Sequence, residues 1–126
     1  MDKKRIFISF AVEDKFARDN LVFQAQQKNT PFDFVDMSVK EPWDSEWKTR
    51  CRTRIKGCDG FIAMVSDNTY NAAGARWEIK CAYEESVPVL PLYIHDEGVK
   101  RLPPELEGHR VYHWTWDVVA SFLDNL

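Results

Sequence analysis

The chain has 126 residues, of which 44% are apolar and 29% are charged, and its formal net charge is −3 at pH 7. This composition is that of a globular domain, and the length suits one core, so we expect residues 1–126 to form a single domain. The slightly acidic balance argues against a general nucleic-acid binder, and no apolar run approaches the ~20 residues of a membrane span.

The first part of the chain predicts a strand, a helix and a second strand. Residues 5–10 are a compact apolar run rich in β-formers, which is typical of a buried strand. Asp14 could cap a helix that runs to about residue 28 with apolar residues at helical spacing. Residues 32–36 then predict the second strand.

The central part repeats the alternation. Residues 45–56 predict a helix, with Asp44 or Ser45 as its N-cap and Gly57 as its stop. Residues 61–65 form the most apolar run of the chain and predict a third, buried strand.

The last part predicts a helix, two strands and a final helix. Residues 75–85 have helical character, and residues 87–94 predict a strand whose two prolines suit its start or a less fully paired position. A polar loop leads to a short strand at 110–113, and Thr115 can cap the closing helix.

Strands that alternate with helices predict an α/β fold with a parallel sheet covered on both faces. Five strands in a chain of this length favour a single doubly wound sheet in the flavodoxin-like order 2-1-3-4-5. In that order, ligands bind at the carboxyl ends of the strands, at the switch point between the first and third strands. The loops there bring together Ser9, Phe10, Asp36, Ser66, Asn68, Thr69 and Glu78.

Several functions of such folds fit the sequence poorly. A flavin carrier needs a hydroxyl- and glycine-rich phosphate loop, but residues 10–14 contain neither glycine nor threonine and carry two carboxylates. A phospho-receiver could use Glu13, Asp14 and Asp67, but no lysine ends the last strand. A Walker or dinucleotide glycine loop is absent.

Other features predict no cofactor and no export. The three cysteines include no C-x-x-C pair, which favours reduced thiols, and His109 and His113 fall on a strand-like segment, so we expect no metal site. The basic residues of 48–56 fit a solvated helix face. The N-terminus leads directly into a strand without a signal-peptide pattern, which predicts a cytoplasmic protein.

Two segments carry a resemblance to a known family. Residues 6–10, followed by Glu13 and Asp14, resemble the first conserved box of TIR domains. The strand in 59–66, followed by Asn-Thr and then Trp-Glu-Ile, is similar to their third strand and catalytic-helix region. The closest resemblance is to the small bacterial TIR-like family that includes the NAD-processing subunit of Thoeris antiphage defence, and it covers nearly the whole chain.

The resemblance implies an enzyme that cleaves the nicotinamide–ribose bond of NAD⁺, with Glu78 as the catalytic residue. NAD⁺ would be the substrate, no cofactor would be needed, and the product would be ADP-ribose or a cyclic isomer that signals in bacterial immunity. Without the resemblance, Glu78 could also be a solvent-facing glutamate in the first turns of a helix, which is common because it complements the helix dipole.

Other residues are expected to bind substrate, each with a structural alternative. Phe10 could line the nicotinamide pocket or be a core aromatic, and Ser9 could hydrogen-bond within the sheet. Asp36 and Ser38 could instead cap a turn, whereas Trp43 could stack on adenine or form an interface. The full expected set is Phe10, Ser9, Asp36, Ser38, Trp43, Asn68 and Thr69.

The chain departs from the family pattern just before Glu78. Most TIR domains carry a tryptophan four residues upstream of the glutamate, where this chain has Gly74. Trp77 is adjacent to Glu78 and points ~100° away on a helix, so it cannot replace that packing. Gly74 therefore predicts either a wider pocket or a degraded site. A degraded site would suit a second hypothesis, a non-catalytic module that assembles with itself or with an effector protein.

Overall fold

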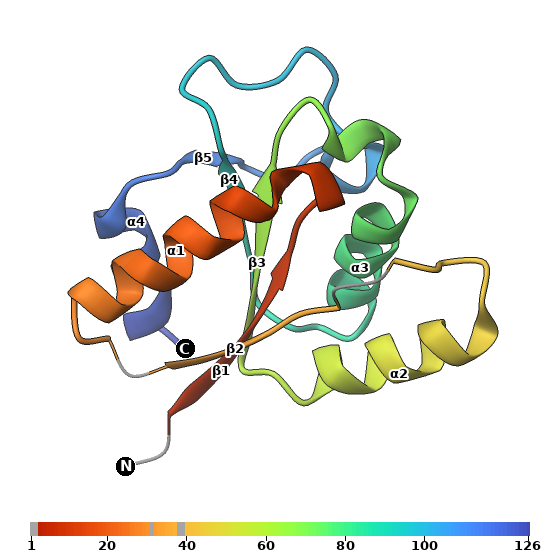
Figure 1. Cartoon of the computed structure of the whole chain (residues 1–126), viewed down its shortest axis with the longest axis horizontal. Coiled ribbons are helices and arrows are strands. Elements are labelled where there is room, and N and C mark those ends of the chain that lie inside the picture. Colours follow the sequence, from red (N-terminus) through yellow and green to blue (C-terminus); the bar gives the residue numbers. More distant parts are fainter. Residues whose placement is uncertain (1–2, 31, 38–39) are drawn as a thin grey trace.

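The computed structural model describes residues 3–30, 32–37 and 40–126, and within them it shows one sheet between two layers of helices (Figure 1). Neighbouring strands pair in parallel, in the order β2-β1-β3-β4-β5. This confirms the α/β class and the flavodoxin-like order. The strands are β1 (Lys4–Ser9), β2 (Phe32–Val35), β3 (Gly60–Val65), β4 (Val89–Tyr93) and β5 (Tyr112–His113).

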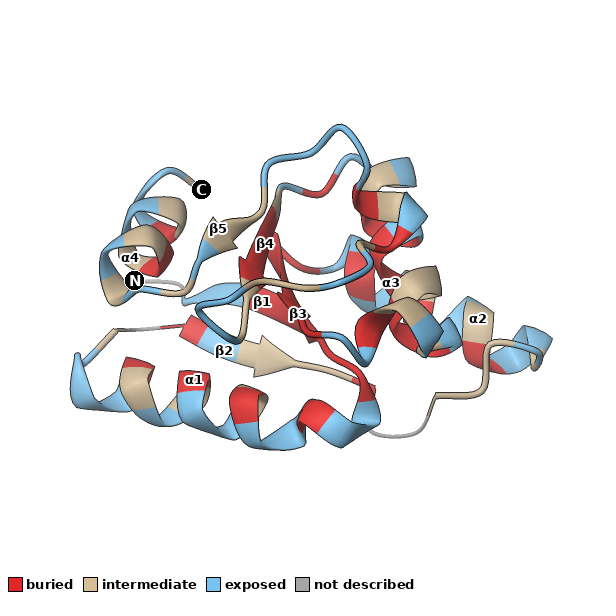
Figure 2. Ribbon diagram, turned by 90° about the horizontal axis from the view of Figure 1, so that it is seen from above, coloured by how far each residue is buried: buried red, intermediate tan, exposed pale blue. Residues whose placement is uncertain are grey.

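Two helices cover each face of the sheet (Figures 1 and 2). α1 (Lys15–Gln27) and α4 (Trp116–Asp124) lie on one face, and α2 (Ser45–Lys56) and α3 (Ala73–Glu84) lie on the other. Among the described residues, no helix is both long enough and apolar enough to cross a membrane.

β3 shows that the sheet is buried on both faces. All six of its residues are buried, and successive side chains point to opposite faces. Phe61, Ala63 and Val65 join the cluster under α2 and α3, where Phe61 stacks on Phe7 of β1 with ring centroids 5.3 Å apart. Ile62 and Met64 join the cluster under α1 and α4. A continuous apolar run in the sequence is therefore a strand with two buried faces.

The helix caps agree with the sequence at two of three positions. Asp44 accepts hydrogen bonds from the backbone N–H groups of Glu46 and Trp47, and Thr115 accepts one from Val118. The prediction that Asp14 caps α1 is wrong, because its side chain makes no cap hydrogen bond. Asp14 is instead buried against the loop after β3, as described below.

Element boundaries moved by a few residues. α3 begins at Ala73, two residues before the expected start, and β5 is limited to two residues. β5 pairs only with Leu92 and Tyr93, so Pro91 of β4 has a ladder partner, Ala63, in β3 alone. This position is less fully paired, as the prolines indicated.

Candidate functional site

Glu78 lies in the second turn of α3 with its side chain turned inward, and it is 0% exposed to solvent. The hydroxyl of Ser9, the last residue of β1, donates a hydrogen bond to Glu78 Oε1 over 2.8 Å. The glutamate therefore lies at the carboxyl end of the sheet, where the strand order predicted a ligand site. The reading of a solvent-facing glutamate that only complements the helix dipole is wrong.

Lys40, from the loop after β2, pairs with Glu78. Its Nζ lies 2.9 Å from Oε1 and 2.8 Å from Oε2, so one ammonium group bridges both carboxylate oxygens. The lysine side chain is only 8% exposed. A carboxylate that is removed from water needs such a partner, because an unpaired buried charge is very costly.

The surroundings of Glu78 shift its pKa in opposing directions. Burial raises its pKa above the ordinary value of 4.5, whereas the positive charge of Lys40 and the hydrogen bonds from Lys40 and Ser9 oppose that rise. The thiol of Cys51 in α2 lies 3.9 Å from Oε2, and burial followed by the negative charge of Glu78 raises the pKa of this thiol. Cys51 therefore stays a neutral neighbour.

Gly74 is what admits Lys40 to this position. A Cβ atom on Gly74 would lie 2.4 Å from Cβ of Lys40, 3.1 Å from its Cγ and 3.2 Å from its Cδ. The space that a side chain at position 74 would fill is thus filled by the aliphatic part of Lys40. Among the described residues, Lys40 therefore separates Glu78 from the space that Gly74 leaves open.

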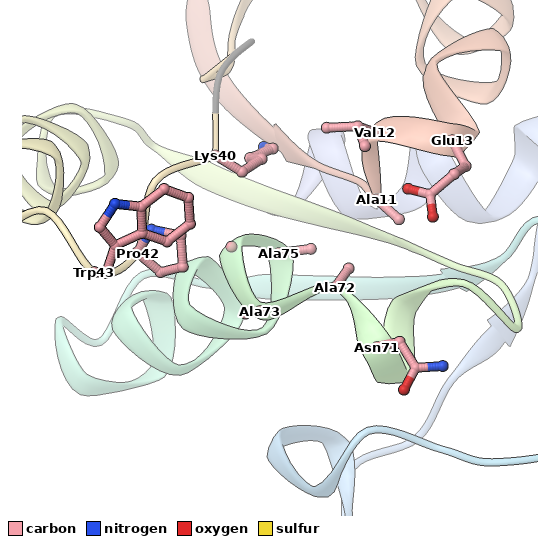
Figure 3. Close-up of a pocket in the computed structure, with 11 residues that line it drawn as sticks. Ala11, Val12, Glu13, Lys40, Pro42, Trp43, Asn71, Ala72, Ala73 and Ala75 are labelled. Atoms are coloured by element: carbon pink, nitrogen blue, oxygen red, sulfur yellow. The ribbon is translucent and has the colours of Figure 1, made fainter.

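A pocket of about 430 Å³ lies next to the pair, and Lys40 forms part of its wall (Figure 3). Figure 3 shows Lys40 between Trp43 on one side and Val12 on the other. The loops after β1, β2 and β3 and the first turn of α3 all contribute. The pocket is lined by Ala11, Val12, Glu13, Lys40, Pro42, Trp43, Asn71, Ala72, Ala73, Gly74 and Ala75.

Of three expected binding residues, Trp43 lines this pocket among the described residues, whereas Phe10 and Asp36 do not. Trp43 lines it and is 77% exposed, so its indole is free to contact a ligand. Phe10 is buried beneath Lys40, whose Nζ lies 4.8 Å from the ring centroid. Asp36 forms an ion pair with Arg18, with Oδ2 3.3 Å from Nε.

The expected residues of the loop after β3 form a separate network with Asp14. The Ser66 hydroxyl and the Asn68 amide each donate a hydrogen bond to the Asp14 carboxylate. Thr69 accepts a hydrogen bond from the backbone N–H of Ser66 and is buried. Asn68 therefore helps to hold the two loops together, Thr69 braces the loop after β3 internally, and neither lines the pocket as the described residues form it.

Trp77 packs away from the site. Its ring meets Trp47 of α2 edge-on, with centroids 5.4 Å apart, as its position one residue before Glu78 predicted. Ser38 was also expected to bind substrate, but it lies outside the described residues. His109 stacks on Tyr83, and no group of three or more potential metal ligands occurs among the residues described.

Sequence reasoning missed Lys40. It lies 38 residues from Glu78, in a loop without hydrophobic periodicity, and no local pattern connects the two. The available signal was indirect: a glycine stands where related domains carry a large aromatic residue, so another group must fill the space.

The family model of the Thoeris protein ThsB, TIR-like domain, matches residues 7–98, which include both halves of the Lys40–Glu78 pair. The chain belongs to this family. The resemblance stated from the two sequence segments is thereby confirmed, and the matched residues include all those that line the pocket.

The fold of this TIR-like domain has a solved counterpart. The 2-deoxyribosyltransferase of the psychrotolerant bacterium Bacillus psychrosaccharolyticus superposes with a TM-score of 0.62 and 17% sequence identity, over 94% of this chain and 95% of that chain. At that identity the likeness shows the fold alone. No curated protein matches the chain.

Proposed function

We propose that this TIR-like domain cleaves the nicotinamide–ribose bond of NAD⁺ in the cytoplasm, and that Glu78 is its catalytic residue. The observation that carries the proposal is the place of Glu78: a carboxylate held by Ser9 at the carboxyl end of β1, beside a pocket of about 430 Å³, in a chain of the ThsB family.

The chemistry asks little of the protein. When the bond between ribose C1′ and the nicotinamide nitrogen breaks, its electron pair leaves with nicotinamide, which departs neutral and needs no proton. The ribosyl group is left as an oxocarbenium-like cation, which an ionised Glu78 would stabilise. Water then bonds to C1′ and releases a proton, giving ADP-ribose. Attack by an adenine nitrogen or ribose hydroxyl of the same molecule would give a cyclic isomer.

Substrate-binding roles follow from the placement of the side chains. Trp43 would stack on the adenine ring at the exposed end of the pocket, since an indole offers a large flat surface. Phe10 would form the apolar floor once Lys40 has moved. Asp36 would act through Arg18, which pairs with it and also faces the Phe10 ring. Asn68 and Thr69 would act indirectly by holding the loop after β3.

Nicotinamide release from NAD⁺ tests the proposal. The purified wild type should release nicotinamide. In Glu78→Gln the rate of release should fall at least 100-fold, because the amide keeps the shape of the side chain but cannot carry the stabilising charge. Glu97→Gln makes the same change at an exposed glutamate outside the pocket lining, and this control should retain the wild-type rate. Nicotinamide release by Glu78→Gln at the wild-type rate would contradict the assignment of Glu78 as the catalytic residue.

A second function is favoured by one observation, the complete burial of Glu78 behind Lys40. A carboxylate fully buried against Lys40 is also what a purely structural ion pair would look like. In that case the domain would be an assembly module, binding a second copy or an effector protein. The two functions differ in one result: a module releases no nicotinamide at any protein concentration, including under conditions that drive assembly.

A further inference from the structure

Glu78 and the pocket are adjacent but not connected. Among the described residues, Lys40 lines the pocket, whereas Glu78 lies behind it and is fully buried. A substrate in the pocket would thus meet the lysine side chain and not the carboxylate. Any role of Glu78 in chemistry requires Lys40 to leave this position.

We propose that Lys40 is a latch: seated on Gly74, its side chain closes the path from the pocket to Glu78, and the site opens when the lysine withdraws. The inference rests on the proposed function for its consequence in catalysis, but the closure itself rests on geometry alone. It adds an autoinhibitory contact within one chain.

The seat of the latch is shaped for a lysine. Gly74 leaves room for the aliphatic stem, whose Cβ would collide with any side chain at that position, at 2.4 Å from a Cβ atom. The ring of Phe10 faces the ammonium group at 4.8 Å, within the range of a cation–π contact. The two oxygens of Glu78 receive the ammonium at 2.8 and 2.9 Å. The space at Gly74, the Phe10 ring and the Glu78 carboxylate together hold the lysine in one position.

Stability alone is a weak reason for such an arrangement. Two charges taken out of water gain little over apolar residues of similar volume, because desolvation offsets their attraction. A pair that can separate has a role besides stability. Lys40 already forms part of the pocket wall, so its side chain can move out to solvent there, and this movement leaves the Glu78 carboxylate facing the pocket.

Carboxyl labelling tests the closure without relying on activity. A water-soluble carbodiimide with glycinamide labels accessible carboxyl groups, and trypsin then releases Trp77–Lys80, a peptide in which Glu78 is the only acid. We expect Glu78 to stay unlabelled in the folded wild type and to become labelled, at least ten times faster, in Lys40→Ala. Equal labelling rates in the two proteins would overturn the latch.

Gly74→Ala provides a second variant that keeps the lysine. Alanine has the higher helix propensity, so α3 should persist, while the added Cβ displaces the lysine stem. Glu78 should again become labelled. Lys28→Ala removes an exposed lysine at the end of α1 and should leave Glu78 as protected as in the wild type. Only variants with the wild-type circular dichroism spectrum are compared, because unfolding would itself expose Glu78. Protection of Glu78 that persists in either folded variant overturns the latch.

Nicotinamide release separates the latch from the proposed function. If the open form is a minor state of the wild type, removing the latch should raise release at limiting NAD⁺ by about 10-fold or more. Labelling without release in any variant supports the latch and refutes the reaction. If the wild type does release nicotinamide, release by Lys40→Ala at the same rate overturns the latch.

Discussion

Glu78 must be ionised to stabilise a ribosyl cation, yet burial makes that charge costly. Burial raises its pKa above the ordinary 4.5, and the charge of Lys40 offsets this only in part. The proposed reaction therefore depends on the very group whose charge the fold makes costly, which is common at active sites.

The pH dependence of the reaction follows from this shift. The ionised fraction of Glu78 grows as pH rises through its raised pKa, so kcat/KM should rise with pH and its acid limb should lie above pH 4.5. The measurement is nicotinamide release at limiting NAD⁺ between pH 4 and pH 9. A rate that is already constant from pH 4 upward would contradict an ionised Glu78 with a raised pKa.

Asp14 has a structural role at the same scale. It is 1% exposed and accepts hydrogen bonds from Ser66 and Asn68, so Asp14→Ala leaves two donors unpaired. We expect a loss of about 2 kcal/mol in the free energy of unfolding, measured in urea. Glu13→Ala, at the exposed neighbouring position, should change it by no more than about 0.5 kcal/mol. Similar losses in both variants would show that the hydrogen bonds to Asp14 do not contribute to the free energy of unfolding.

At the residue scale, the sequence predicted part of the site. Topology placed Ser9 and Glu78 together, because the carboxyl ends of parallel strands share an edge. It could not predict Lys40 or the partners of Asp14. Both depend on which side chains of irregular loops fill the remaining space, and a loop has no periodicity from which to infer it.

At the scale of elements, α2 and α3 form a unit that supports the site from behind. Trp47 and Trp77 pack edge-on between the helices, and Arg52 reaches from α2 to Glu84 and Glu85 at the end of α3. Arg52 thus does more than face solvent. It ties α2 to α3, which carries Glu78.

Arg52→Ala should loosen this pair of helices. The arginine is partly exposed and pairs with two glutamates, so we expect a loss of about 1 kcal/mol in the free energy of unfolding, and less at high salt. Arg50→Ala on the same helix removes only an exposed pair with Glu46 and should cost no more than about 0.5 kcal/mol. Equal effects in urea titrations would argue against a link between the helices.

Elements with a strong pattern were predicted best. β3 is a continuous apolar run, and α2 has both a capping aspartate and a terminal glycine, and each was found within a residue of its expected bounds. The start of α3 was misjudged, since Ala72 and Ala73 carry neither a cap nor a periodic apolar stripe. Asp14 was misjudged because tertiary donors outcompeted the local cap.

At the scale of the whole molecule, the fold tolerates great change in sequence. A transferase with 17% identity keeps the same architecture over nearly its full length. Sheet order and buried strands follow from hydrophobic patterning, which many sequences satisfy, whereas the chemistry follows from a few side chains at the edge of the sheet.

The buried thiols should make global stability fall in alkaline solution. Burial raises the pKa of Cys58 and of Cys81 from 9.0 to about 11 and also raises that of Cys51. Their stabilising effect is complete below pH 9 and is lost as pH rises towards the folded-state pKa, because the unfolded chain releases its protons first.

Cys81→Ala isolates one of these thiols. Between pH 8 and pH 11 the free energy of unfolding of the wild type should fall by up to about 2 kcal/mol more than that of the variant. The variant also leaves a small cavity, but that loss is the same at every pH. Parallel stability curves from denaturant titrations would contradict the raised pKa of Cys81.

Glu78 is proposed to act in catalysis and Lys40 to cover it, and one measurement tests both claims together. Nicotinamide release from NAD⁺ is compared between Lys40→Ala and the double variant Lys40→Ala/Glu78→Gln at the same protein concentration. We predict release by the single variant at about 10 times the wild-type rate or more, and a loss of at least 100-fold in the double variant. Equal release by the two variants, or none from either, would contradict the account.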